Sequence, residues 1–254
     1  MKEREYIVNS VIRAFSILEA FSLRKSEQSI SELKVATGLP FSTLHRLLAT
    51  MEKIGYIRQN SETGKYRLGI RNFILGNQVK LVTELRMIAA PILKSLSDKY
   101  NETVHMAVEL DGQLLCIEKV EAHHRMSVTP SAGGFESLHR TSVGKCLLAF
   151  ADKAYQEEIL GKLELTKHTE YTITDKEVLR HQLADIRKNG YSIDNQELEL
   201  GLMCFGAPVF AHSGECIAAL SLSIPIVRLG DRSDDIRDDV QKAAGQITDM
   251  LRGL

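Results

Sequence analysis

The sequence predicts an α+β protein in which an N-terminal winged helix-turn-helix domain precedes a larger mixed domain. Near the start, two short helical patterns flank a turn at Gly38, and a two-stranded pattern follows them. Beyond residue 100, strands and helices follow one another without regular βαβ alternation. A length of 254 residues fits two domains. We therefore expect a winged helix domain in 1–70, a linker helix in 71–83 and a second domain in 84–254.

The composition is that of an ordinary globular protein, with 44% hydrophobic and 26% charged residues. Disordered, collagen-like and membrane classes therefore have no support. The charge is unevenly placed, because residues 1–70 hold 11 Lys and Arg against 7 Asp and Glu, whereas residues 71–254 hold 21 against 26. The whole-chain charge of −1 hides this basic first segment, which could bind a polyanion.

The cysteines are widely spaced and form no CxxC pair, so no disulfide framework is expected and a reducing compartment fits best. No apolar run reaches the roughly 18 residues of a membrane span, and the start lacks the apolar core of a signal peptide. We expect a cytoplasmic protein with no membrane partner. The four cysteines are Cys116, Cys146, Cys204 and Cys216.

Three helices are predicted in the first domain. The second starts at Ser31 and ends at Gly38, and the third runs from about Pro40 to Ile54, where Gly55 stops it. Residues 56–60 and 65–68 then alternate around a polar, Gly-bearing turn, which predicts a hairpin, the wing. The first helix is marked by apolar residues three and four apart, namely Val11, Ala14, Phe15, Leu18 and Phe21.

The second domain is predicted to mix helices with two hairpins. Residues 71–101 are helix-forming but interrupted by Gly76 and Pro91, and Asp111-Gly112 is a strong hairpin signal. The expected hairpins are 103–110 with 113–120 and 202–211 with 215–226, and the expected later helices are 143–150, 153–160, 175–189 and 231–251.

One face of the third helix is expected to contact DNA. Its apolar stripe of Leu44, Leu47, Leu48, Met51 and Ile54 must pack inward. The opposite face is small, polar or basic, and in a helix-turn-helix the first residues of this helix reach base edges. Arg46 can bind a guanine edge, and His45 can donate to a base or phosphate. The face is centred on Ser42, Arg46, Ala49 and Lys53 and flanked by Thr43, His45 and Thr50.

The predicted wing adds Arg58, Lys65 and Arg67, placed to contact phosphates or the minor groove. The alternative is a solvated helix face beside a charged hairpin. We favour DNA binding because helix, turn, helix and wing occur together in the one segment with a positive balance.

Short motifs in both domains carry a family resemblance. They lie at residues 8–19, 39–48, 55–56, 66–69, 139–145, 190–194, 201–204, 207–210 and 218–223. In this order and spacing they resemble the IclR family of bacterial transcriptional regulators, over nearly the whole chain.

The resemblance implies an N-terminal winged helix domain, a linker helix and a C-terminal GAF-like effector-binding domain. It implies a homodimer or dimer of dimers that binds double-stranded DNA at a palindromic operator. We expect a ligand-responsive regulator of a catabolic operon, controlled by a small carboxylate, with no cofactor and no enzymatic activity. Whether it represses or activates stays open.

The resemblance also implies an effector pocket. Backbone amides near Ser142 and Val143 would line it, with Leu202 as an apolar wall. Ser221 and Ser223 alternate on one strand, so their hydroxyls face the same side, and hydroxyl donors suit a carboxylate. The alternative is that both serines face water. The remaining implied side chains are those of Asp194, which can accept from a ligand hydroxyl, and Cys204.

The sequence departs from the family's usual pattern beside this pocket. Gln196 stands where Glu is frequent, Gly206 where Ala is frequent, and Ile224 where Gly is frequent. These departures leave the identity of the ligand open, with a weak preference for a small polar acid over a bulky aromatic one.

Three other constellations suggest rival functions. Cys204 with Asp194 and a histidine suggests a cysteine-dependent hydrolase, but no nucleophile-elbow pattern accompanies it. Cys204 or Cys116 could serve a redox sensor. A metal site among the histidines is less favoured than exposed loop positions, because no carboxylate or Cys lies at ligand spacing. Those histidines are His123, His124 and His139.

Overall fold

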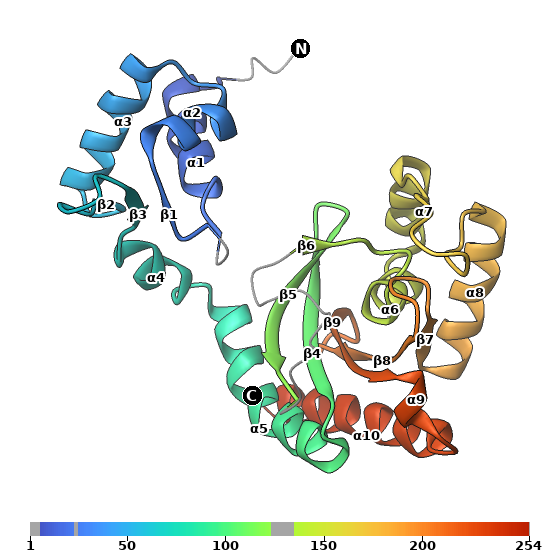
Figure 1. The fold of residues 1–254 in the computed structure, drawn as a ribbon. Coiled ribbons are helices and arrows are strands. Elements are labelled where there is room, and N and C mark those ends of the chain that lie inside the picture. Colours follow the sequence, from blue (N-terminus) through green and yellow to red (C-terminus); the bar gives the residue numbers. More distant parts are fainter. Residues whose placement is uncertain (1–5, 23–24, 123–134, 254) are drawn as a thin grey trace. The chain divides into compact units, whose positions relative to one another are not determined.

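The computed structural model describes residues 6–22, 25–122 and 135–253. The chain forms two compact units, Met1–Thr83 and Glu84–Leu254 (Figure 1). Both units combine helices with antiparallel sheet, which confirms the α+β class.

The first unit is a winged helix-turn-helix domain. Its helices pack around a three-stranded sheet of order β1-β3-β2. The sequence predicted the three helices and the β2–β3 hairpin but not β1, a two-residue strand that pairs with β3. The elements are α1 (Asn9–Glu19), β1 (Glu27–Gln28), α2 (Ile30–Thr37), α3 (Phe41–Lys53), β2 (Ile57–Gln59), β3 (Tyr66–Leu68) and α4 (Arg71–Gly76).

Helix α2 begins at Ile30, one residue before the predicted start at Ser31, because Ser29 is its N-cap. The Ser29 hydroxyl accepts from the backbone N–H of Glu32 at 3.3 Å, and the Glu32 carboxylate accepts from the Ser29 N–H at 2.7 Å. This capping box satisfies two N–H groups that the helix leaves unpaired. The helix ends at Gly38, whose φ of 69° is left-handed, as predicted.

The core of the first unit lies between α1, α2 and α3. On α3, Leu44, Leu48 and Met51 are buried as predicted, but Ile54 of the same stripe is exposed because it lies past the last helical residue, Lys53. On α1 the predicted stripe is partly wrong, because Val11 and Phe15 are exposed while Ile17 is fully buried. Helix α1 is apolar around most of its circumference, so spacing alone did not identify the inward side.

The second unit is built on a six-stranded antiparallel sheet of order β6-β5-β4-β9-β8-β7. The two predicted hairpins form its centre, and the β4–β5 turn is at Asp111 and Gly112. The elements are α5 (Lys80–Tyr100), β4 (Thr103–Leu110), β5 (Gln113–Val120), β6 (Phe135–Glu136), α6 (Ser142–Phe150), α7 (Lys153–Lys162), α8 (Lys176–Asn189), β7 (Ser192–Asn195), β8 (Leu202–Phe210), β9 (Cys216–Pro225), α9 (Ile226–Leu229) and α10 (Ser233–Arg252).

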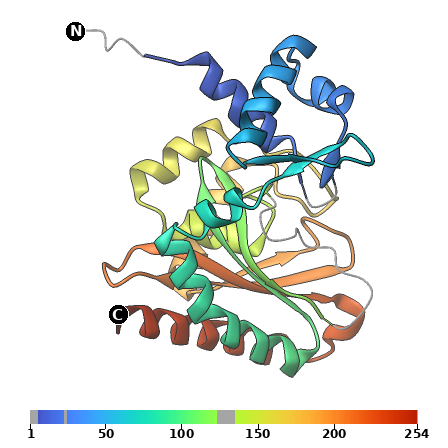
Figure 2. The same cartoon turned by 90° about the vertical axis from the view of Figure 1, so that its left-hand side faces the viewer.

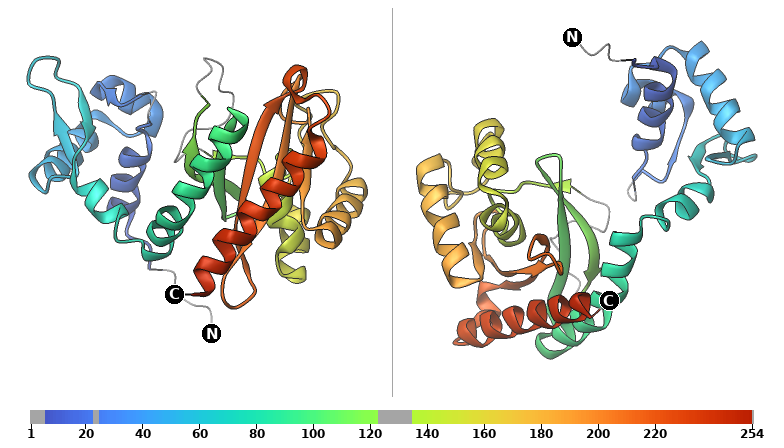
Figure 3. Two further views of the ribbon diagram at one scale, coloured as in Figure 1. Left: turned by 90° about the horizontal axis from the view of Figure 1, so that it is seen from below. Right: turned by 180° about the vertical axis from the view of Figure 1, so that it is seen from behind.

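Helices cover both faces of this sheet. Helices α6, α7 and α8 lie on one side, and α5 and α10 lie on the other (Figure 2). Helices α5 and α10 run side by side (Figure 3), and the Lys99 ammonium of α5 pairs with the Asp239 carboxylate of α10. This sandwich of helices and sheet is consistent with the expected GAF-like architecture.

Helix α5 continues through Pro91, where the sequence predicted an interruption. Proline cannot donate to the carbonyl four residues earlier, that of Met87. Both residues lie on the exposed side of the helix. The opposite side buries Leu85, Ala89 and Leu93, and this packing holds the helix together. The linker differs from the prediction in another way. Residues 71–83, expected as one linker helix, contain α4, a short break and the first residues of α5.

The edge strands β6 and β7 were not predicted from the sequence. Strand β7 pairs with β8 in register Ser192↔Gly206 and Asp194↔Cys204. It follows the left-handed Gly190 that ends α8, and only four residues of it are extended. So short a strand gives too few alternations for the pattern to be read.

Gly206 allows the start of α6 to lie directly on the sheet. A Cβ built on Gly206 would be 2.7 Å from the Ser192 Oγ and 3.0 Å from the Ser142 carbonyl carbon. Distances this short leave no room for a methyl group. The missing side chain therefore sets how closely α6 approaches strands β7 and β8.

Replacing Gly206 by Ala should lower the free energy of unfolding by about 1–3 kcal/mol, because the methyl overpacks this contact. Within a strand, the same replacement would ordinarily be neutral or stabilising. Urea unfolding followed by circular dichroism measures the change. The control is Gly245→Ala in α10, where a Cβ meets nothing within 4 Å. Equal effects of the two substitutions would contradict the packing argument.

Candidate functional site

The outer face of α3 presents the polar residues that the sequence selected. Ser42, His45, Arg46 and Thr50 are exposed, and Thr43 is half-buried. The N-cap of α3 is Pro40, which has no side chain able to accept from the first N–H groups. The start of α3 therefore offers backbone donors beside small hydroxyl side chains, which suits phosphate.

The wing places two guanidinium groups opposite each other. Arg58 on β2 pairs directly with Arg67 on β3, and both are exposed. Like charges in this arrangement repel. Glu27 on β1 offsets part of the charge through a 3.9 Å ion pair with Arg67. Lys65, also assigned to DNA contacts, is half-buried at the foot of β3.

In the second unit, polar residues form two rows across β7, β8 and β9 on the face covered by α6. The first row is Asp194, Cys204 and Ser223, which are directly paired across the three strands. The second row, two residues away on each strand, is Ser192, Gly206 and Ser221. Because side chains alternate along a strand, both rows point to the same side.

The start of α6 is tied to the second row. The Ser142 and Ser221 hydroxyls are 2.8 Å apart, and the Ser192 hydroxyl donates to the Ser142 carbonyl at 2.6 Å. The first intrahelical bond runs from the Lys145 N–H to the Thr141 carbonyl. The N–H groups of Ser142 and Val143 precede that bond, so they have no partner within the helix.

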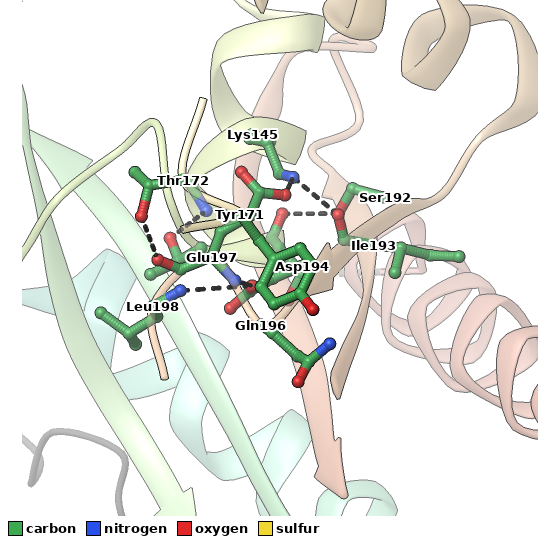
Figure 4. Close-up of polar contacts among 12 residues, drawn as sticks. Lys145, Tyr171, Thr172, Ser192, Ile193, Asp194, Gln196, Glu197 and Leu198 are labelled. Carbon is green, nitrogen blue, oxygen red and sulfur yellow. Dashed lines mark hydrogen bonds and ion pairs between the residues drawn. The ribbon is translucent and has the colours of Figure 1, made fainter. Parts of the chain in front are cut away.

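A buried ion pair connects α6 to the segment after β7 (Figure 4). The Lys145 side chain is fully buried, and its ammonium pairs with the Glu197 carboxylate and donates to the Ile193 carbonyl at 2.6 Å. Burial raises the pKa of Glu197, and the Lys145 charge opposes this shift. Thr172 also fixes the segment, since its hydroxyl donates to the Glu197 carbonyl at 2.7 Å.

Asp194 is oriented by the same segment. Its Oδ1 accepts from the Glu197 N–H at 2.7 Å and from the Leu198 N–H at 3.4 Å, as Figure 4 shows. Burial raises the pKa of Asp194 to about 6, with Lys145 acting in the opposite direction. The backbone thus fixes the orientation of one carboxylate oxygen, and the Asp194 carboxylate lies beside the Cys204 thiol in the first row.

Cys204 is a buried thiol. Burial raises its pKa well above the ordinary value, and the Asp194 charge raises it further. The thiol donates to the Ser223 hydroxyl at 3.3 Å. Buried thiols with a raised pKa are the unreactive kind, which weighs against a hydrolase or a redox sensor that uses Cys204. Burial likewise raises the pKa of Cys116, to about 11, which weighs against the other redox candidate.

The structure brings the predicted pocket residues together. The alternative in which Ser221 and Ser223 face water is wrong, because both are buried. Leu202 precedes Cys204 by two positions on β8, so it faces the same side. The full predicted set, all of it buried, is Ser142, Val143, Asp194, Leu202, Cys204, Ser221 and Ser223.

Sequence reasoning missed three polar groups in this region. Lys145 and Glu197 were not assigned to a buried ion pair, and His105 on β4 was not singled out. A signal existed for Lys145, which stands within the otherwise apolar run of α6. His105 alternates with Val104 and Met106 on β4, so the sequence places it on the opposite side from those apolar residues and gives no signal that it is buried.

The prediction that His139 is exposed is wrong. His139 is fully buried, with its Nδ1 2.7 Å from the Ser137 hydroxyl and its Nε2 3.4 Å from the Thr166 carbonyl. His123 and His124 lie outside the described residues. Among the residues whose positions are given, no cluster of three His, Cys, Asp or Glu could hold a metal ion.

Both units match known protein families. Residues 10–61 match the IclR helix-turn-helix domain, and residues 78–249 match the bacterial transcriptional regulator IclR C-terminal domain. The chain belongs to the IclR family. It is therefore a transcriptional regulator with a DNA-binding domain and an effector domain, as the sequence predicted, and not an enzyme.

Individual IclR-family relatives align over most of the chain. The transcriptional repressor IclR of Escherichia coli is 35% identical over 97% of this chain and 91% of its own length. The regulator XynR of the same organism is 36% identical over 93% of this chain and 94% of its own length. Among solved structures, an IclR homologue from Microbacterium hydrocarbonoxydans complexed with 4-hydroxybenzoate superimposes with a TM-score of 0.89, at 28% identity over 96% of this chain and all of that one.

None of the helices in the described part of the chain is long and apolar enough to cross a membrane.

The raised pKa of Asp194 gives a pH-dependent prediction. The folded carboxyl, with a pKa of about 6 against an ordinary 3.8, binds a proton that the unfolded chain releases at lower pH. Its contribution to stability is therefore complete below about pH 4 and lost as the pH rises through 6. Relative to Asp194→Asn, the wild type should lose up to about 3 kcal/mol between pH 4 and pH 7.

Urea unfolding of both proteins across this pH range tests the prediction. The asparagine Oδ1 can still accept from the Glu197 and Leu198 amides, so the variant isolates the charge. A difference between the two proteins that does not change with pH would show that the Asp194 carboxyl is not perturbed.

Proposed function

We propose that this protein controls a catabolic operon in the cytoplasm in response to a small carboxylate effector. Residues 1–70 would bind DNA and residues 84–254 would bind the effector. Residues 71–83 would be the linker between these two domains. The observation that carries the proposal is the pair of buried polar rows beneath the start of α6, where hydroxyls and helix-terminal amides meet on one face of the sheet.

For DNA, we propose that α3 enters the major groove with Arg46 and His45 directed at base edges. The sugar-phosphate backbone next to these bases would be contacted by Ser42, Thr43 and Thr50. The wing would lie against phosphates, because the facing Arg58 and Arg67 repel each other until an anion lies between them. Lys65 would add a sequence-independent phosphate contact.

We propose a homodimer, or a dimer of dimers, that reads a palindromic operator. Apolar side chains remain exposed on α1 at Val11, Ile12 and Phe15, and on α4 at Phe73 and Ile74. Exposed apolar stripes of this kind commonly mark association surfaces. A two-fold dimer would present two α3 helices to successive half-sites.

For the effector, we propose that the carboxylate is bound by the Ser221 and Ser223 hydroxyls and by the amides at the start of α6. Leu202 would form an apolar wall, and Cys204 would line the floor of the pocket between Asp194 and Ser223. The Asp194 carboxylate would accept from a hydroxyl of the ligand. The relative from Microbacterium hydrocarbonoxydans was crystallised with 4-hydroxybenzoate, which carries both a carboxylate and a hydroxyl.

Effector binding would alter DNA affinity by coupling the two domains. A coupling free energy of roughly 1–3 kcal/mol, or about 5- to 150-fold in affinity, is typical of such systems.

Arg46→Ala should cost about 1–3 kcal/mol of operator binding and relax the preference at one base position, because a bidentate contact is lost. Selection of bound duplexes from a random pool measures the base preference. Fluorescence anisotropy with the selected duplexes then measures the affinity. Lys65→Ala is the matched control and should weaken binding to every sequence while reducing the salt dependence. Unchanged base preference in Arg46→Ala would remove this face of α3 from the interface.

Ser221→Ala should abolish the effector response, because it removes a hydroxyl proposed to bind the carboxylate. DNA affinity in the absence of effector should be unchanged, because Ser221 belongs to the second unit and the DNA-contacting face belongs to α3 in the first. A thermal-shift screen of keto, hydroxy, sugar and aromatic acids first selects the acid that stabilises the wild type most. Anisotropy with labelled operator then compares the response to that acid in Ser221→Ala and in Ser213→Ala, an exposed turn serine. A full response in Ser221→Ala would refute the pocket.

A further inference from the structure

The polar face beneath α6 extends beyond the rows on β7, β8 and β9. On β4, Thr103 is paired with Ser223 and His105 with Ser221. On β5, Lys119 is paired in turn with His105. Side chains directly opposite each other across strands share a face, so His105 and Lys119 continue the row that contains Ser221.

His105 is buried but lacks a partner at one ring nitrogen. The residue is 5% exposed, and its Nδ1 makes no hydrogen bond within the part of the chain that the structure describes. Buried polar atoms are nearly always paired, so an unpaired one indicates a ligand. Burial lowers the pKa of His105 to about 4, and the Lys119 charge contributes to this shift. The imidazole is therefore neutral at pH 7 and can offer an N–H.

Lys119 brings a positive charge to the same end of the face. Its side chain is 7% exposed, whereas that of Glu121, 2.9 Å away, is 62% exposed. Solvent screens the charge of so exposed a carboxylate. Lys119 is directly paired with His105 across β4 and β5, so its charge acts on the imidazole and helps to lower the pKa of His105.

The charges along the face are thus arranged in order. Acidic groups, Asp194 and Glu197, lie at the β7 end, and the second of them is paired with Lys145. The cationic Lys119 and the donor His105 lie at the β5 and β4 end. Ser221 and Ser223 on β9 stand between the two ends. An anion entering this face is attracted to the β4–β5 end and repelled by Asp194.

We propose that His105 and Lys119 form an anion-binding end of the effector pocket, where they hold the effector's carboxylate together with Ser221. The proposal rests on the effector pocket proposed above and fixes the ligand's orientation within it. His105 donates a hydrogen bond and selects for an acceptor, and Lys119 supplies the charge. The opposite end of the ligand points toward Asp194, which accepts from a hydroxyl.

This orientation defines the class of ligand. Strands β4 and β7 are separated by β9 and β8, so their backbones are about 14 Å apart at the usual strand spacing. A ligand that reaches from His105 toward Asp194 therefore needs its carboxylate and its hydroxyl several bonds apart. Aromatic hydroxy acids and sugar acids meet this requirement, and two- or three-carbon keto acids do not.

Isothermal titration calorimetry on the full-length protein tests the anion site with two acid and amide pairs. The probes are 4-hydroxybenzoate with 4-hydroxybenzamide, and D-gluconate with D-gluconamide. The variants His105→Leu and Lys119→Met remove the two groups. Matched controls are His181→Asn and Lys153→Met, whose side chains are exposed on α8 and α7. Thermal unfolding verifies that each variant is folded, and His105→Asn, which keeps a side-chain N–H, replaces a leucine variant that does not fold.

The wild type should bind at least one acid ten or more times as tightly as its amide. His105→Leu and Lys119→Met should each lose at least tenfold in affinity for that acid while binding the amide within about twofold of the wild type. If His105→Asn is the histidine variant used, it should retain more of the acid affinity than Lys119→Met. The two control variants should behave as the wild type does.

Two results would overturn the proposal in distinguishable ways. If an acid binds the wild type and the two variants bind it equally well, the anion site is refuted while the carboxylate effector stands. If neither acid binds the wild type, the anion site is refuted, and the carboxylate effector fails with it once the wider acid screen is also negative.

Discussion

The buried ion pair between Lys145 and Glu197 holds the second unit's polar face in place. It joins α6 to the segment after β7, and that segment in turn orients Asp194 through two backbone amides. Two charges removed from water cost several kcal/mol each, so the loss of one partner leaves the other buried and uncompensated. The position of α6, and with it the amides of Ser142 and Val143, depends on this pair.

Around that constraint, the sheet register arranges chemistry by strand. Asp194, Cys204 and Ser223 form one row. The second row begins at Ser192, passes through Gly206 and Ser221, and ends at His105 and Lys119. Gly206 contributes by having no side chain, because α6 occupies the space that a Cβ would take. An apolar core at the other end of α6 supports the arrangement, and its members include Leu147 and Ala219.

The sequence predicted what local pattern controls. The β4–β5 hairpin followed from Asp111-Gly112, and period two placed the Ser221 and Ser223 hydroxyls on the same side of their strand. That this side is buried was implied only by the family resemblance. The sequence could not predict features that depend on tertiary contacts. Helix α5 stays continuous at Pro91 because its opposite side is packed, and the buried side of α1 depends on which of its two apolar stripes packs against α2 and α3. His105 could be assigned to the polar face only from the strand pairing, which places it opposite Ser221.

The facing arginines of the wing have a consequence for the protein without DNA. Arg58 and Arg67 push β2 and β3 apart, and Glu27 relieves only part of that force. Dissolved salt weakens repulsion between exposed charges as readily as it weakens attraction to a duplex. Raising the ionic strength should therefore detach the regulator from its operator while making the free wing a more rigid hairpin.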